Sequence, residues 1–120
     1  MTPAIEALEA LARRAVACRG WRWMPGMLLS SPRSWGLRIV TGPIEEHADA
    51  APVLTDPATL GCLLALVREA WGDPYLIATK ERGSCWIIAI HLCDAMLVGG
   101  RYIRGATEIE ALIAALEAAP

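Results

Sequence analysis

Apolar residues recur every three or four positions in three segments of this chain, the spacing that lines one face of a helix. The pattern predicts helices over residues 3–18, 57–71 and 108–118. A glycine follows each of the first two segments, Gly20 and Gly72, as is typical of helix ends. Periodicity therefore predicts three helices spread over the whole chain.

Each predicted helix begins with a side chain that can cap backbone N–H groups. The starts are Thr2–Pro3, Asp56–Pro57 and Thr107 with Glu110, the last of which is a capping box. Gly61 lies inside the second helix, where glycine is about 1 kcal/mol less favourable than alanine. We therefore expect another element to pack closely against Gly61.

Between the helices, apolar residues alternate with polar ones or form short runs, which predicts strands. The predicted strands are residues 27–30, 35–41, 75–79, 85–92 and 101–104. Turn residues separate the first two strands and the next two, so each pair is predicted to form an antiparallel hairpin. Residues 42–55 begin with Gly42–Pro43 and show little periodicity, which predicts the longest loop.

The order of elements predicts the fold class. It is α-β-β-α-β-β-β-α, in which the strands come as hairpins rather than as βαβ units. A length of 120 residues agrees with a single domain. We predict one α+β domain over residues 1–120, with a mainly antiparallel sheet packed by helices on one side.

Composition excludes several classes of protein. Hydrophobic residues make up 55% of the chain and charged residues 20%, which excludes intrinsic disorder. A net charge of −2 excludes general nucleic-acid binding through a basic surface. No uninterrupted apolar segment reaches the ~18 residues of a transmembrane helix. The longest candidate, residues 85–98, contains His91 and Asp94 and is predicted to form buried strands.

Hydropathy and the first residues suggest where the protein acts and in what form. The mean hydropathy of +0.39 is high for a domain without a membrane segment. A second copy that covers apolar surface would explain it, so we expect a homo-oligomer. The first charged residue, Glu6, is acidic, which does not fit a secretory signal, and we expect a cytoplasmic location.

Arginine and tryptophan are interleaved after the first helix and form the main candidate site. The candidate ligand-binding residues are Arg13, Arg14, Arg19, Trp21, Arg22 and Trp23. Guanidinium groups bind phosphates through two parallel hydrogen bonds, and indole rings stack on bases. In an extended segment, Trp21 and Trp23 would share one face and Arg22 the other. In the alternative interpretation, the tryptophans are core or interface residues and the arginines are solvated.

Metal binding and catalysis have weaker support. Cys85, His91 and Cys93 share one face of a predicted strand, but Cys85 and His91 would be about 20 Å apart. No Cys-x-x-Cys pair accompanies them, so we expect no metal site. We expect free thiols at all four cysteines, among them the apolar-flanked Cys18 and Cys62. Neither histidine has a recognisable catalytic partner, so we expect neither an enzyme nor a cofactor.

Three segments carry a resemblance to a known group of proteins. Residues 13–27, residues 56–72 and the ending Gly105-Ala106-Thr107-Glu108 followed by Glu110-Ala111-Leu112 resemble small accessory proteins encoded by bacteriophages and prophages of GC-rich bacteria. No activity is established for that group, so the resemblance assigns no functional residues. It implies a phage origin and action in the cytosol of an infected cell.

Two classes of binding function then compete. One is a sponge that sequesters a nucleotide-derived immune signal, such as a cyclic ADP-ribose isomer or a cyclic oligonucleotide, in a pocket between subunits. The other is a protein inhibitor of a host defence complex, as anti-CRISPR proteins are; a DNA mimic of that kind would be far more acidic. A virion or morphogenesis component is a third class. The arginine and tryptophan cluster and the expected oligomer favour the sponge.

Overall fold

The computed structural model describes residues 3–30, 37–41, 50–80, 83, 85–90 and 101–120. The helices are α1 (Pro3–Val16), α2 (Pro57–Trp71) and α3 (Glu108–Ala118). The strands are β1 (Leu28–Ser30), β2 (Leu37–Ile39), β3 (Ala51–Pro52), β4 (Ile77–Lys80), β5 (Trp86–Ile90) and β6 (Arg101–Gly105). The α+β class and the predicted order of elements are confirmed, and β3 is an additional short strand.

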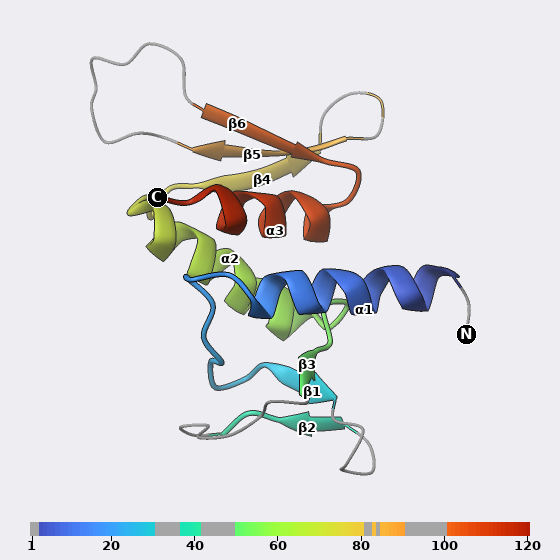
Figure 1. Cartoon of the computed structure of the whole chain (residues 1–120). Coiled ribbons are helices and arrows are strands. Elements are labelled where there is room, and N and C mark those ends of the chain that lie inside the picture. The colour runs from blue at the N-terminus through green and yellow to red at the C-terminus, as the bar shows by residue number, and fades with distance from the viewer. Residues whose placement is uncertain (1–2, 31–36, 42–49, 81–82, 84, 91–100) are drawn as a thin grey trace.

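The helices lie between two small antiparallel sheets (Figure 1). One sheet has the strand order β2-β1-β3 and the other β4-β5-β6. The expectation of one sheet with helices on one side is wrong, because the strands divide between two sheets. Strand β1 pairs with β2 on one side and with β3 on the other. Because β3 lies within the predicted loop of residues 42–55, the first sheet is complete before α2 begins.

Local capping determines where the helices begin and end. The bounds predicted for α2 and α3 are confirmed, whereas α1 ends two residues before the predicted residue 18. The carboxylate of Asp56 accepts the Thr59 N–H at 3.0 Å, and Gly72 ends α2 in the left-handed conformation at φ 63°. The Thr107 hydroxyl accepts the Glu110 N–H at 3.1 Å, the first bond of a capping box, and the Glu110 carboxylate accepts the N–H of Ala106. Thr2 lies outside the described residues.

Two glycines differ in the space around them. Gly61 is exposed, and a Cβ added there would meet no heavy atom within 4 Å, so the expectation of close packing at Gly61 is wrong. At Gly105, the end of β6, an added Cβ would lie 2.8 Å from the Cα of Ala111. The backbone is therefore closely packed at the connection from β6 to α3, because the chain reverses direction there and lies against the first turn of the helix.

The core consists of the apolar faces that the helices turn toward each other and toward the sheets. Alternate residues of β5, Ile88 and Ile90, are buried, and α3 packs against β4, β5 and β6. Leu63 and Val67 of α2 are fully buried in the same cluster. Among the described helices, none combines the length and the apolar character needed to cross a membrane.

Candidate ligand-binding site

The chain leaves α1 through a tight turn that brings the candidate residues to the ends of the other two helices. The Cys18 N–H donates to the Ala15 carbonyl and the Trp21 N–H donates to the Cys18 carbonyl, each at 3.1 Å. A Cβ on Gly20 would lie 3.0 Å from Leu116 Cδ1 and 3.3 Å from Ala70 Cβ. A glycine at position 20 thus allows the turn to lie against both α2 and α3.

A cavity of about 480 Å³ opens beside this turn. Arg14 and Arg19 line it together with small or apolar residues of α2 and α3, among them Ala70 and Leu116. Its volume lies within the ~300–1,000 Å³ of typical small-molecule sites. Two arginines therefore line one open cavity with a partly apolar wall.

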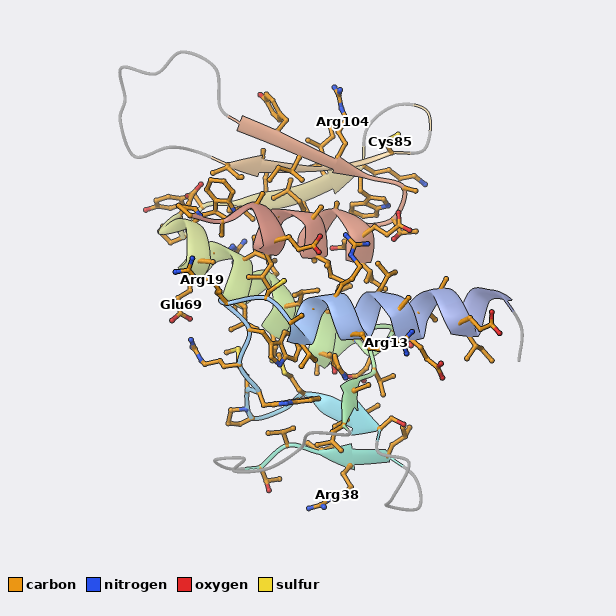
Figure 2. All side chains as sticks on the ribbon, in the orientation of Figure 1. Arg13, Arg19, Arg38, Glu69, Cys85 and Arg104 are labelled. Carbon is orange, nitrogen blue, oxygen red and sulfur yellow. The ribbon has the colours of Figure 1, made fainter. Side chains whose placement is uncertain are left out.

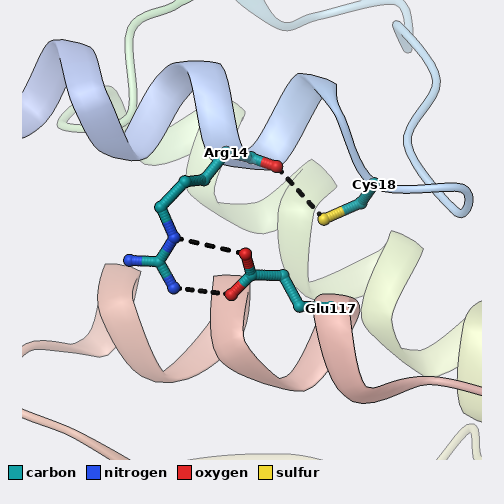
Figure 3. Close-up of polar contacts among 3 residues, drawn as sticks. All are labelled: Arg14, Cys18 and Glu117. Atoms are coloured by element: carbon teal, nitrogen blue, oxygen red, sulfur yellow. Dashed lines mark hydrogen bonds and ion pairs between the residues drawn. The ribbon is translucent and has the colours of Figure 1, made fainter.

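Arg14 is held by a carboxylate from the other end of the chain (Figure 3). Its Nη2 lies 2.5 Å from Glu117 Oε1, and its Nε donates to Oε2 at 3.2 Å. The hydrogen bond from Arg14 lowers the pKa of Glu117, and the same bond raises the pKa of Arg14. Both side chains are exposed, so the pair contributes little to stability and is open to exchange with another anion.

Cys18 forms part of the same cavity wall. Its thiol donates to the Arg14 carbonyl at 3.2 Å, and burial raises its pKa (Figure 3). A raised pKa favours the thiol over the thiolate, so Cys18 is a poor nucleophile. Cys18, Cys62 and Cys85 are free, as expected, although Cys18 and Cys62 are partly rather than fully buried.

Arg22 is not among the residues that line this cavity. Its Nη1 lies 2.6 Å from Glu69 Oε2 on the surface of α2, and the hydrogen bond from Arg22 lowers the pKa of Glu69. Both side chains are exposed. Arg22 therefore ties the segment after α1 to α2.

Trp21 and Trp23 contact each other edge to face, with ring centroids 5.4 Å apart and an angle of 82° between the ring planes. Both are half-buried and pack against the hydrophobic core, which agrees with the alternative interpretation of the sequence. The Trp21 Nε1 is buried and has no hydrogen-bond partner among the described residues. The two rings are thus in contact with each other and with the core, whereas Arg22 is exposed.

The six predicted site residues thus divide into three groups. Arg14 and Arg19 line the cavity, whereas Trp21, Arg22 and Trp23 hold the turn against the core and α2. Arg13 lines a separate groove, and Figure 2 shows it on α1, well apart from Arg19 on the segment that follows the helix. Sequence reasoning missed the two partner carboxylates, because Glu117 lies 103 residues from Arg14 and no local pattern joins them.

The described residues contain no group of three or more His, Cys, Asp or Glu side chains that could hold a metal ion. Of the metal candidates, His91 and Cys93 lie outside the described residues. Comparison with protein-family models, with curated proteins and with solved structures found no match to this chain. The site is therefore interpreted from its own geometry.

Proposed function

We propose that this protein is a non-catalytic binding protein of a phage-infected cell, acting in the cytoplasm, that sequesters a nucleotide-derived immune signal. The observation that supports this function best is the cavity that Arg14 and Arg19 line. Guanidinium groups bind phosphate oxygens through two parallel hydrogen bonds. The resemblance of the chain to phage accessory proteins supports the biological setting.

In this proposal the ligand's phosphate replaces Glu117 on Arg14. The Glu117 carboxylate already presents two oxygens to the guanidinium, in the arrangement that a phosphate would offer. Arg19, which has no ion pair with a described residue, supplies the second positive group. The apolar wall at Leu116 and Ala70 then contacts the sugar or base.

Trp21 and Trp23 have an indirect part in this function. Their contact with the core holds the turn that carries Arg19, and Arg22 pairs with Glu69 of α2 at the surface of the protein. Replacing either tryptophan would disturb the cavity through the position of the turn. Direct phosphate contact is assigned to Arg14 and Arg19 alone.

Calorimetric titration with cyclic ADP-ribose isomers and cyclic dinucleotides tests the proposal. We expect Arg19→Ala to weaken binding about ten- to a hundredfold, the contribution of hydrogen bonds between charged groups. Glu117→Gln should strengthen binding, because it releases Arg14. Arg38→Ala is the matched control, since Arg38 is an exposed arginine on β2 outside the cavity. Absence of binding by every probe, or equal loss in Arg19→Ala and Arg38→Ala, would contradict the proposal.

A protein inhibitor of a host defence complex is the second candidate function, and the outer face of the β4-β5-β6 sheet supports it. Ile77 and Tyr102 lie in one row across that sheet, joined by Ala89, and are 43% and 62% exposed. Exposed apolar and aromatic side chains in a row are typical of protein-binding surfaces. In the same titrations this function predicts no small-molecule binding, and a complex with a host protein that Tyr102→Glu abolishes.

A further inference from the structure

An apolar groove runs along the side of α1 away from the ligand cavity. Its volume is about 810 Å³, and its walls are α1 with the following Ala17, Ser30 of β1, and residues 50–55. On α1, Ile5, Leu8, Ala12 and Val16 follow one another at intervals of three and four residues and line the groove. Ile5 is 47% exposed and Val16 37% exposed, so the two ends of this stripe are open to solvent.

The groove carries one acidic and one basic residue. Glu9 and Arg13 line it, are both exposed and lie one helical turn apart. Neither forms an ion pair with a described residue. A partner that contacts this stripe would bind best if it placed a basic residue beside Glu9 and an acidic residue beside Arg13.

A second copy of α1, running antiparallel, offers that order. A two-fold axis between positions 10 and 11 of α1 places Ile5 opposite Val16 of the other copy. The same axis places Glu9 beside Arg13 of the other copy, and each contact occurs twice because the interface is self-complementary. We infer that this groove is the interface of a homodimer, formed by α1 packing antiparallel against α1 of a second copy.

The size of the interface determines how strong the dimer is. At 1.5 Å per residue, the 14 residues of α1 are about 21 Å long. We expect one helix face of this length, with residues 50–55 beside it, to bury less than the ~800 Å² per partner of a standard interface. We therefore expect a weak dimer that forms at micromolar or higher concentrations, and whose formation depends on the charges at Glu9 and Arg13.

Charge reversal tests this interface with two variants and their mixture. Arg13→Glu makes both charged positions acidic, and Glu9→Arg makes both basic. Sedimentation should show each variant as a monomer at concentrations where the unmodified protein is a dimer. An equimolar mixture of the two variants should dimerise again, and native mass spectrometry should show one chain of each. Arg38→Glu is the control, because it reverses an exposed arginine outside the groove and should dimerise normally.

Other outcomes would overturn the inference. These are an unmodified protein that stays monomeric up to millimolar concentration, variants that dimerise alone, or a mixture that stays monomeric. Higher salt should weaken the dimer of the unmodified protein, because salt screens the attraction between the exposed Glu9 and Arg13 side chains of the two copies. Circular dichroism spectra should be unchanged in every variant, because Glu9 and Arg13 are exposed and their replacements are tolerated in helices.

Discussion

At the scale of single residues, ion pairing decides what each arginine can do. Arg14 and Arg22 are both held by exposed carboxylates, but only Arg14 lies in a cavity where a ligand could take the place of its partner. The sequence shows the arginines as equivalent members of one cluster. Contacts with Glu117 and Glu69 distinguish them, and both contacts come from other helices.

Glu117 should make the affinity for an anion depend on pH. Its pKa is lowered by Arg14, and displacement by a phosphate returns the pKa toward its ordinary value of 4.5. Binding therefore takes up a proton between the lowered pKa and 4.5, so affinity should rise as the pH falls through this window. Calorimetry with a uridine-based cyclic dinucleotide, which does not titrate there, measures this effect.

The variant Glu117→Gln provides the control for this pH dependence. It removes the titrating carboxyl group. Its affinity for the cyclic dinucleotide should therefore exceed that of the unmodified protein at neutral pH, and should not change between the lowered pKa of Glu117 and 4.5. The Arg14–Glu117 pair also contributes to folding above the unfolded pKa of Glu117, and this contribution disappears as pH falls through the lowered value. Because the pair is exposed, the protein should remain folded during the titration. The same slope in both proteins would show that Glu117 is not the linked group.

At the scale of elements, the helices follow from local sequence and the strands only partly. Caps at Asp56, Gly72 and Thr107 act within a few residues, and the bounds of α2 and α3 were predicted from them. Strand β3, by contrast, exists only because Ala51 and Pro52 pair with β1. A two-residue strand has no periodicity of its own, so the sequence predicts a loop there.

At the same scale, two glycine substitutions should change the free energy of unfolding in opposite directions, one through a steric clash and the other through helix propensity. Gly105→Ala should lower the free energy of unfolding by about 1–3 kcal/mol or more, because its Cβ would overlap the backbone of α3 at Ala111. Gly61→Ala should raise it by about 0.5–1 kcal/mol, because the site is helical and open. Urea unfolding of both variants gives the two free energies. Equal changes in the two variants would contradict the packing described at β6 and α3.

At the scale of the whole molecule, α1 contributes neighbouring residues of the sequence to two different surfaces. Arg13 and Arg14 are neighbours in the chain, but successive side chains on a helix differ by about 100° in direction. Arg13 therefore lines the groove beside residues 50–55, and Arg14 lines the cavity beside α3. The proposed ligand site and the proposed dimer interface therefore use different residues of α1, and they meet at Ala17 just after its end.

This separation predicts that the two functions respond to different variants. Arg13→Glu should abolish the dimer and change ligand affinity by less than about twofold, because Arg13 lines the groove and not the cavity. Ala17, just after α1, lines both. Arg19→Ala should weaken ligand binding and leave the dimer intact. Calorimetry and sedimentation on both variants measure the two effects. If loss of the dimer also removes ligand binding, the cavity needs the second copy to be complete.

The sequence by itself determined the three helices, the N-caps of α2 and α3, and the α+β class. These features depend on periodicity and on hydrogen bonds between residues a few positions apart. Only the tertiary structure decided that the strands form two sheets on opposite sides of the helices. It also decided that Arg14 pairs with Glu117 and that Arg13 lies apart from Arg14. The physical reason is that these features depend on contacts between distant segments, which no local pattern encodes.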